Sequence, residues 1–432
     1  MSNKRPCMAR LSRLLRYLVL VTFCAMISFS GYIFLNFLPT FEKGQLISQR
    51  RSPFIGSRDE NEVGFAPRDH PGHLQKHSNN FRERYELMYE SHQIDFGSDT
   101  VKDSKKCLIY RCDTSKMSGC GDWVDHVKGI EAAYIIANLT GRVFKAEMHG
   151  FPCKLTDYIQ PNVVNWTLYK TFHAVLNKGM AGVSIRNFDN NPSFYNNLYK
   201  LELLEIVPEN FEYVYFKSNL DYISGFQNST LYRRKLSWMQ GLGRDEIHAA
   251  LYKRLFRLAP RLLKKLQLFL FSILPSPEHR LICVDLGTKM NWSLSSEDNR
   301  INQLKYLSNI WSFIRTHSST NIDKVFINTD SSEILSLAKA ESFRSRLVAS
   351  PQKRRTSTHS EQLQSVCESL EADILNQHIL VNCDILVVSS NSLGHLAAYL
   401  RETDKGLYCL MGNGHIHPCR ADRLNELYMM HE

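Results

Sequence analysis

Four short motifs that mark common enzyme classes are missing from this chain of 432 residues. It has no G-x-x-x-x-G-K-[ST] stretch, which argues against a P-loop, and no G-x-G-x-x-G after its first predicted strand, which argues against a dinucleotide enzyme. The absence of G-x-S-x-G argues against the nucleophile elbow of an α/β hydrolase. No Asp-x-Asp occurs either, which argues against a sugar transfer that depends on Mn²⁺ or Mg²⁺ held by paired carboxylates.

The composition is that of a folded protein. With 43% hydrophobic residues over 432 positions, the chain has enough apolar side chains for two packed cores, at roughly 100 to 200 residues per domain. No internal repeat is visible. Disorder, a collagen-like chain and a minimal disulfide scaffold are therefore excluded.

The net charge of +10 is divided among separate parts of the chain. Residues 39–106 balance to zero and residues 107–432 carry +5, although Leu231–Lys265 alone carries +8. Basic residues alternate with leucines there, which favours a solvated helix face over a surface for an anionic ligand. The first 38 residues carry +5 and no acid, from Lys4, Arg5, Arg10, Arg13 and Arg16.

An uncharged run of 22 residues, Tyr17–Leu38, follows this basic tail. At about 1.5 Å per residue it is long enough to cross a hydrocarbon core of about 30 Å. The flanking cations favour a cytosolic N-terminus, so the rest of the chain would be luminal. A cleaved signal peptide is the alternative, but the run exceeds the usual core of about 7 to 15 residues and no clear cleavage site follows. We expect an uncleaved signal anchor, and no contact with nucleic acid.

Sequons and cysteines agree with a luminal location. Of four sequons, Asn138 is the weakest, because it falls within a predicted buried helix; the set is Asn138, Asn165, Asn228 and Asn291. Nine cysteines would be luminal, and this odd number leaves at least one unpaired. Cys283 and Cys383 lie in apolar strand patterns, as buried thiols or bridge ends. Four more could form disulfide bridges near the start of the luminal part, and the sequence does not specify how they pair: Cys107, Cys112, Cys120 and Cys153.

The luminal part divides into a stem and two α/β halves. Residues 39–106 lack apolar periodicity, as expected of a stem after the cytosolic tail (1–16) and the anchor (17–38). The first half, 107–275, opens with a strand at Leu108–Tyr110, a glycine turn and a helix at Ile130–Leu139. A split near Pro275–Pro277 leaves 276–432 as the second half, with a cleft expected between them.

Strands and helices alternate through the second half, which predicts a parallel, doubly wound sheet. The expected strands are Leu281–Leu286, Val325–Asn328, Leu347–Ala349, Ile385–Val388 and a final one at Leu407–Leu410. The expected helices are Glu297–His317, Ser331–Lys339, Glu361–Ile379 and Leu393–Leu400.

Four polar or glycine-rich loops follow predicted strands. Ligands of open parallel sheets bind beyond the carboxyl ends of the strands, where helix N-termini present N–H groups to phosphates. The loops are Gly119–Asp122, Asp285–Lys289, Asn328–Ser332 and Ser389–Gly394. They suggest a nucleotide whose phosphates are held by hydroxyls, N–H groups and Lys289. With the missing motifs, this favours metal-independent group transfer from an activated nucleotide in the secretory pathway.

Three stretches carry a resemblance to a known superfamily. Gly121-Asp-Trp-Val-Asp-His-Val-Lys-Gly129 resembles the G-N-x-x-D-H-x-x-G stretch of protein O-fucosyltransferases. Ser392-Leu-Gly-His-Leu-Ala-Ala-Tyr-Leu400 resembles the T-F-G-x-W-A-A-Y-L signature of α1,2-fucosyltransferases. Val325-Phe-Ile-Asn-Thr-Asp-Ser331 is similar to the strand that ends in T/S-D-S in that superfamily. The order and spacing of the three fit over residues 107–420.

This resemblance implies a GT-B fold of two Rossmann-like domains in a type II Golgi membrane protein. It implies GDP-fucose as donor, held mainly by the C-terminal domain, a glycan or glycoprotein acceptor at the N-terminal domain, and no metal or other cofactor. The reaction would be an inverting displacement at the anomeric carbon of fucose. Carried over by position, Asp330 and Ser331 would contact the nucleotide, Ser392 and Gly394 the diphosphate, and Gly121 with Asp122 the sugar.

A cation is missing where the superfamily has one. Its first phosphate motif reads H-x-R-x-G-D or R-T-G, and Gly287 stands in place of the arginine. Thr288 and Lys289 follow as candidate donor contacts, but an ammonium does not replace a guanidinium fork. Either activity is weak, another cation substitutes, or the chain is a luminal relative that binds a glycan or a partner without catalysis. A transferase using another nucleotide sugar is a third reading.

The candidates for a carboxylate base are Asp122, Asp125 and Glu131. His126 and His395 are interpreted as structural. His415 and His417 are interpreted as residues of the loop that follows the last strand rather than as a metal pair.

Overall fold

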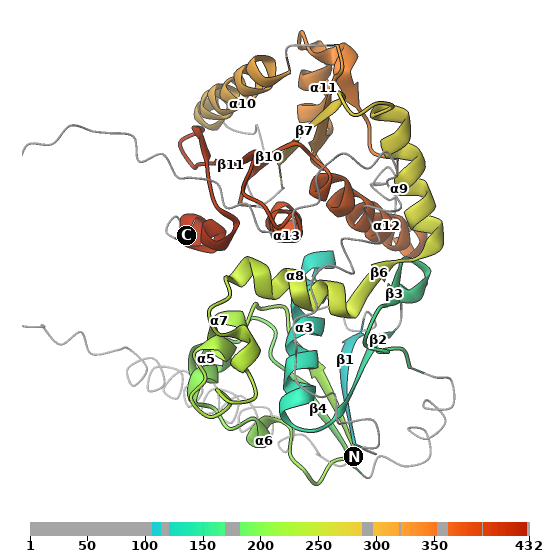
Figure 1. The fold of residues 1–432 in the computed structure, drawn as a ribbon, viewed down its shortest axis with the longest axis vertical. Coiled ribbons are helices and arrows are strands. Elements are labelled where there is room, and N and C mark those ends of the chain that lie inside the picture. The colour runs from blue at the N-terminus through green and yellow to red at the C-terminus, as the bar shows by residue number, and fades with distance from the viewer. Residues whose placement is uncertain are drawn as a thin grey trace, which may run out of the picture. The chain divides into compact units, whose positions relative to one another are not determined.

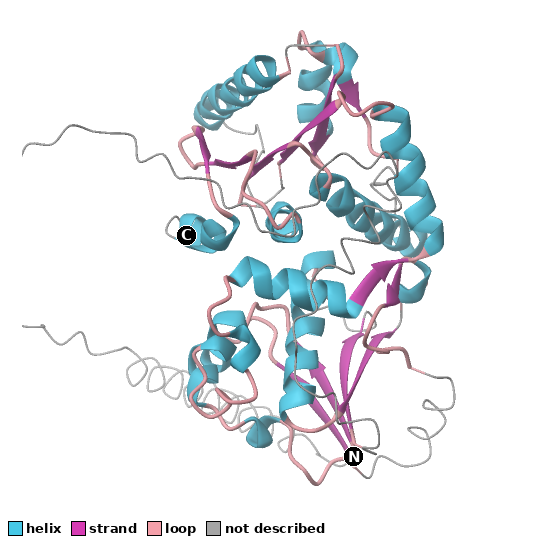
Figure 2. Ribbon diagram, viewed as in Figure 1, coloured by secondary structure: helices cyan, strands magenta, loops and turns pink. Residues whose placement is uncertain are grey.

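The computed structural model describes residues 106–113, 121–149, 151–168, 182–286, 297–318, 321–351, 362–390 and 392–429 (Figures 1 and 2). All of these residues belong to one compact unit of the chain. No described helix is long and apolar enough to cross a membrane. The predicted anchor at 17–38, the stem and the residues from Gly287 to Asn291 lie outside the described ranges.

The first sheet has four parallel strands in the order β2-β1-β5-β4. Its central strand β1 is buried on both faces, since Leu108 and Ile109 are both 0% exposed, which explains its unbroken apolar run. Helix α3 links β1 to β2 and packs on both. The bounds are β1 Cys107–Asp113, α3 Trp123–Leu139, β2 Val143–His149, β4 Val183–Asn187 and β5 Tyr213–Lys217.

The second sheet has six strands in the order β12-β11-β10-β7-β8-β9. Five of them are parallel and confirm the predicted strands to within two residues. The prediction that the strand at Leu407–Leu410 is the last was wrong, because β12 adds an antiparallel edge and contains His417. The bounds are β7 Arg280–Asp285, β8 Asp323–Asn328, β9 Leu347–Val348, β10 Ile385–Val388, β11 Leu407–Leu410 and β12 Ile416–Pro418.

Helices cover this second sheet. They are α10 Glu297–His317, α11 Ser332–Ala340, α12 Gln362–Val381, α13 Ser392–Leu400 and α14 Leu424–Met429. Two of them, α12 and α13, also pack on helix α3 of the first half. Strands β3 Ile159–Pro161 and β6 Phe256–Leu258 form a separate antiparallel pair. The remaining helices are α5 Pro192–Asn197, α6 Leu203–Ile206, α7 Ile223–Gln227, α8 Arg244–Leu255 and α9 Pro260–Ile273. The α/β class with mainly parallel sheets is thus confirmed.

A disulfide joins the two sequence halves. Cys153, which the sequence grouped with other early cysteines, is bonded to Cys367 at the start of α12. Cys283 and Cys383 are bridge ends, and they pair with each other, from β7 to the second residue before β10. The third described bridge, Cys409–Cys419, ties β11 to the chain after β12. Cys107 is a buried free thiol.

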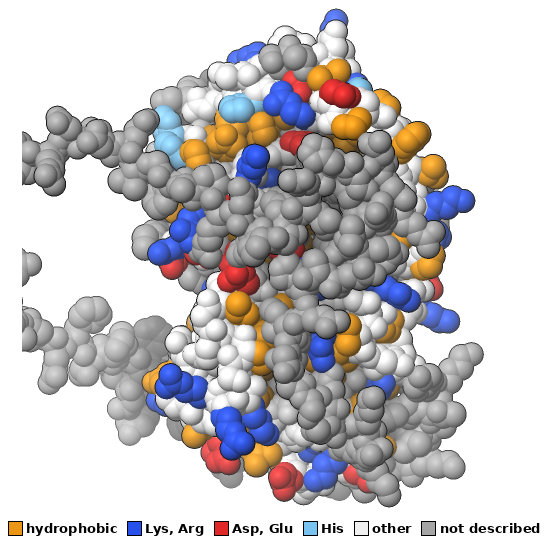
Figure 3. Space-filling model, viewed as in Figure 1, with side chains coloured by type: hydrophobic (Ala, Val, Ile, Leu, Met, Phe, Trp, Pro, Cys, Tyr) orange, Lys and Arg blue, Asp and Glu red, His pale blue; other side chains and the backbone are white. Residues whose placement is uncertain are grey.

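Cations of the Leu231–Lys265 segment form specific contacts rather than one basic surface. Lys253 pairs with Glu402, and Arg261 and Lys265 both bind Glu371 of α12. Helix α9, which precedes the predicted split near Pro275, therefore packs on a helix of the second half. On the face shown in Figure 3, Lys and Arg side chains lie at separate places. These ion pairs connect α8 and α9 of the first half to residues of the second half.

Candidate functional site

The second sheet reverses its winding direction at β7. Strand β8 lies on one side of β7 and β10 on the other, and both pair with it in parallel. In open α/β sheets, ligands bind outside the carboxyl ends of the strands at such a reversal. The loop that begins at Asp285 follows β7, and the loop that begins at Ser389 follows β10. The fold therefore brings these two predicted loops together.

Polar side chains are buried at this edge. Asn328, at the end of β8, donates to Asp285 at the end of β7, and Asn376 of α12 donates to Asn328 over 2.9 Å. A Cβ on Gly394 would lie 2.5 Å from Oδ2 of Asp285, so glycine lets the first turn of α13 approach this carboxylate. The hydroxyl of Ser389 is fully buried and has no hydrogen-bond partner among the described residues. A buried hydroxyl without a partner is a ready contact for a ligand.

The other predicted donor contacts lie along the same edge or outside the described residues. Ser331 caps α11, since its hydroxyl accepts from the N–H of Ile334. Asp330 is exposed in the turn before it. Ser392 is the first residue of α13. Thr288 and Lys289 are not among the described residues, so their roles stay predictions.

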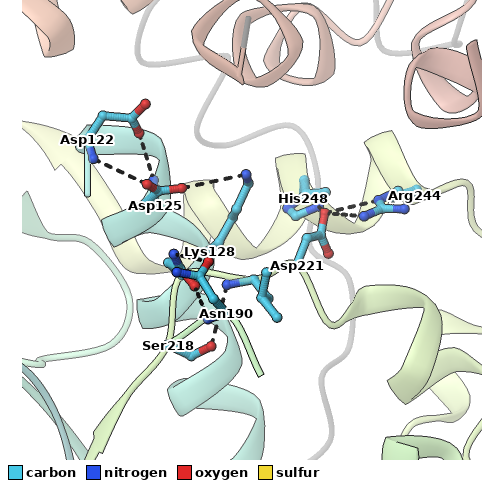
Figure 4. Close-up of polar contacts among 10 residues, drawn as sticks. Asp122, Asp125, Lys128, Asn190, Ser218, Asp221, Arg244 and His248 are labelled. Atoms are coloured by element: carbon cyan, nitrogen blue, oxygen red, sulfur yellow. Dashed lines mark hydrogen bonds and ion pairs between the residues drawn. The ribbon is translucent and has the colours of Figure 1, made fainter. Parts of the chain in front are cut away.

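At the carboxyl edge of the first sheet, the start of α3 explains the glycine and aspartates of its motif (Figure 4). Gly121 has φ +75°, and a Cβ there would clash with the carboxylate of Asp125. That carboxylate accepts from the N–H of Asp122, whose own carboxylate accepts from the N–H of Asp125 over 3.0 Å. This capping box starts the helix seven residues before the predicted Ile130. It gives both aspartates a helix-capping role, while their proposed catalytic role stays a prediction.

The rest of this motif serves packing. A Cβ on Gly129 would clash with the backbone oxygen of Ser218 and the ring of Tyr110, so glycine allows α3 to lie close to β1 and β5. His126 is buried and its Nδ1 lies 3.0 Å from the hydroxyl of Tyr110. Burial lowers the pKa of His126 to about 4. These contacts agree with its interpretation as a structural residue.

Glu131 lies near the middle of α3, in a buried network of charged side chains. His248 of α8 places Nδ1 2.7 Å from Oε2 of Glu131 and Nε2 2.6 Å from Oδ2 of Asp221, which follows β5. Arg244, one turn before His248, binds the same Asp221 oxygen at 2.6 Å. Figure 4 shows Arg244 and His248 both directed at Asp221. The four side chains thus alternate in charge from α3 to α8.

Burial and charge set the pKa values in this network. Burial alone would lower the pKa of His248, but the carboxylates of Asp221 and Glu131 raise it to about 9. Burial raises the pKa of Glu131, against the effect of His248. His248 and Arg244 hold the pKa of Asp221 well below its usual range, although burial opposes them. His248 is therefore an imidazolium at neutral pH.

Sequence reasoning found Glu131 but missed His248, Asp221 and Arg244. Their positions follow from how α8 packs on α3, and no spacing between residues 131 and 248 signals that contact. The C-terminal motif was the one indication in the sequence, because it contains Tyr399. In the structure this tyrosine stacks on His248, with ring centres 5.1 Å apart. Helix α13 packs on both α3 and α8, so the helices that carry the two motifs meet at this network.

The remaining predicted residues are distributed as follows. Asn165 and Asn228 are exposed, whereas Asn138 is half-buried near the end of α3, and Asn291 lies outside the described ranges. His395 donates toward the backbone oxygen of Ser389 over 2.9 Å and stacks on Tyr428. No described group of three or more His, Cys, Asp or Glu side chains could hold a metal ion.

No protein-family model and no curated protein sequence matches the chain. It is similar to solved structures of fucosyltransferases, the superfamily that its motifs resemble. One is a variant of Arabidopsis thaliana FUT1 in complex with GDP, at 11% identity and a TM-score of 0.49, with 76% of this chain and 78% of that chain covered. Another is NodZ from Bradyrhizobium, at 12% identity and a TM-score of 0.42, with 72% and 97% covered. A third is POFUT1 in complex with GDP-fucose, at 10% identity and a TM-score of 0.38, with 71% and 96% covered. With TM-scores below 0.5, these similarities assign neither an activity nor a ligand to this chain.

Proposed function

We propose that the protein is a metal-independent, inverting fucosyltransferase that moves fucose from GDP-fucose to a hydroxyl of a glycan. One observation carries the proposal: α13 packs against α3, and the two helices begin with the motifs that resemble fucosyltransferases. Each helix follows a parallel strand, so each N-terminus lies at the carboxyl edge of its sheet. Donor and acceptor would meet where these two edges come together.

The second sheet offers the groups that a nucleoside diphosphate needs. The N-terminus of α13 supplies N–H groups that have no partner within the helix, and the positive end of a helix dipole. Beside it, the buried hydroxyl of Ser389 lacks a partner within the part of the chain that the structure describes. Asp330 and Ser331 follow β8, on the other side of β7, and would contact the nucleoside. In the reaction, the acceptor oxygen bonds to the anomeric carbon while the bond to the β-phosphate breaks, and the acceptor proton passes to a base.

The compartment is part of the proposal. A signal anchor at 17–38 would place the folded part in the Golgi lumen, facing glycoprotein acceptors. The described disulfides are of the kind that persists in an oxidising compartment, which supports this location.

Calorimetric titration of the full-length chain, purified in detergent, with GDP, GDP-fucose, UDP and CMP tests the donor. We expect the guanine ligands to bind, and Asp330→Ala to weaken GDP binding by at least tenfold. Glu333→Ala is the matched control, because it removes an exposed carboxylate from the first turn of α11, just beyond the predicted contacts. Absence of GDP binding to the unaltered chain would refute the proposal.

One observation favours a second candidate, a luminal relative that binds a glycan or a partner without transferring fucose. The carboxylate of Asp285 lies against Gly394 in the first turn of α13, where a diphosphate would bind. A carboxylate there repels the negatively charged phosphate. The superfamily's arginine, which would offset this charge, is replaced by Gly287. Release of GDP from GDP-fucose separates the candidates, since only an enzyme turns the donor over.

A further inference from the structure

Glu131 has one carboxylate oxygen that the fold leaves without a partner. The residue is 1% exposed, and Oε2 is bound by His248, but Oε1 is buried and makes no hydrogen bond with any described residue. A buried polar atom without a partner destabilises the folded state, and a charged one does so more strongly. In an ion pair with only a structural role, we expect both carboxylate oxygens to accept hydrogen bonds.

His248 fixes which oxygen is left free. Both of its ring nitrogens face carboxylate oxygens, so both carry protons and both donate. Asp221 takes one proton and is itself held by Arg244, while Tyr399 covers the face of the imidazole ring. The ring can neither turn nor accept a hydrogen bond from elsewhere. Oε2 is therefore held by His248, and Oε1 is the carboxylate oxygen that no described residue binds.

A shallow pocket lies beside this oxygen. It is a surface depression rather than an enclosed cavity, and Lys128, Glu131, Asp221 and His248 line it on the polar side. Tyr222 and Phe226 form part of the apolar wall. Lys128, one helical turn before Glu131, also lies 3.9 Å from Asp125 of the capping box, which connects the pocket to the start of α3. A carboxylate oxygen without a partner is an acceptor for a group that donates a hydrogen bond, such as a hydroxyl.

We propose that Glu131 is the general base of the transfer, with Oε1 as the proton acceptor and His248 and Asp221 as positioning residues. The inference rests on the proposed function. The hydroxyl proton of the acceptor moves to Oε1 as the acceptor oxygen forms its bond to the anomeric carbon. The bond from that carbon to the β-phosphate oxygen breaks, and its electron pair leaves with GDP. Glu131 ends as the carboxylic acid and returns the proton to solvent.

Hydrolysis of GDP-fucose tests this role without knowledge of the glycan, because water supplies the hydroxyl. GDP release is measured with the full-length chain in detergent, for the unaltered protein and for Glu131→Gln. The amide keeps the size of the side chain but cannot take up the proton. We expect its kcat to fall by about 100-fold or more, with the Kd for GDP unchanged within twofold. Glu371→Gln is the control, since it takes a buried carboxylate out of ion pairs with Arg261 and Lys265, and its kcat should stay unchanged.

The pH profile separates a base from a residue that only supports the fold. The charges that face Glu131 are His248 from α8, Asp221 after β5 and Lys128 on α3 itself, with the Tyr399 ring over His248 from α13. The unaltered protein should lose kcat as the pH falls and Glu131 takes up a proton, and Glu131→Gln should lack this acid limb. An unchanged kcat in Glu131→Gln, a retained acid limb, or an equal loss in Glu371→Gln overturns the assignment while GDP still binds. If GDP does not bind to the unaltered chain, the proposed function itself fails and the assignment fails with it.

Discussion

The rings of His248 and Tyr399 lie almost parallel, with 5° between their planes and 5.1 Å between their centres. His248 belongs to α8, and Tyr399 lies near the end of α13, the helix whose first turn faces the second sheet's carboxyl edge. The stack therefore links the Glu131 network to the motif that resembles the C-terminal signature of fucosyltransferases. It also gives that tyrosine a physical role, since it covers a buried imidazolium from solvent.

Protonation of His248 should make stability depend on pH above neutrality. Its pKa is raised to about 9 in the folded protein, against about 6.5 in the unfolded chain. The stabilisation is complete below about pH 6.5 and is lost as the pH rises through about 9. We expect the difference in free energy of unfolding between the unaltered protein and His248→Gln to shrink by on the order of 2 to 3 kcal/mol from pH 6 to pH 9.5. Urea titration at several pH values measures it, and a difference constant over this range would contradict the prediction.

Gly129 should be intolerant of the smallest side chain. In an exposed helix, Gly→Ala stabilises by about 1 kcal/mol. Here a Cβ would meet the backbone oxygen of Ser218 and the ring of Tyr110, so α3 would have to move away from the sheet. We expect Gly129→Ala to lower the free energy of unfolding by about 1 to 3 kcal/mol.

Gly412 is the control for this substitution. A Cβ there has nothing within 4 Å and the residue has an ordinary φ, so Gly412→Ala should change stability by less than about 0.5 kcal/mol. Thermal or urea unfolding of the two variants side by side makes the comparison. Equal stability of Gly129→Ala and the unaltered protein would show that α3 does not lie as close to Ser218 as described.

Local patterns predicted the elements of the second half well. Strands β10 and β11 and helix α10 have the predicted bounds, because buried parallel strands are short apolar runs and a long helix shows its period. The start of α3 was missed, since Trp123 and Val124 are buried in a helix apolar on nearly every side and the capping aspartates resemble turn residues. The pairing of β12 with β11 was missed for another reason: it depends on a turn at Gly414 rather than on an apolar run.

The same distinction between local patterns and long-range packing applies to the residues of the candidate site. The loops at strand ends could be predicted from the sequence, since parallel sheets place ligands at such ends. Glu131 was named there as one of three candidate bases. The partners of Glu131 could not, because His248 reaches it only through the packing of α8 on α3. The contact between Cys153 and Cys367 likewise follows from the approach of the two halves and leaves no trace in local spacing.

The exposed sequons should carry glycans if the folded part is luminal. Asn165 and Asn228 lie in exposed positions, and Asn138 is half-buried in the last turn of α3. We expect Asn165→Gln and Asn228→Gln each to increase gel mobility by one glycan, and Asn138→Gln to leave it unchanged. Endoglycosidase treatment, which should bring all variants to one mobility, is the control. Identical mobility of every variant before treatment would contradict the luminal location.

The disulfide between the halves should stabilise the fold more than the short one near the C-terminus. Cys153 and Cys367 are 214 residues apart in sequence, and Cys409 and Cys419 are 10 apart. In the chain-entropy account, a bridge stabilises by restricting the unfolded chain, to about 5 kcal/mol for the longer loop and about 3 kcal/mol for the shorter. Paired substitution to alanine should therefore cost about 2 kcal/mol more at the first bridge than at the second. Urea unfolding of both double variants under non-reducing conditions measures the difference. A larger loss at Cys409–Cys419 would mean that contacts other than this bridge, such as the ion pairs of Arg261 and Lys265 with Glu371, already hold the two halves together.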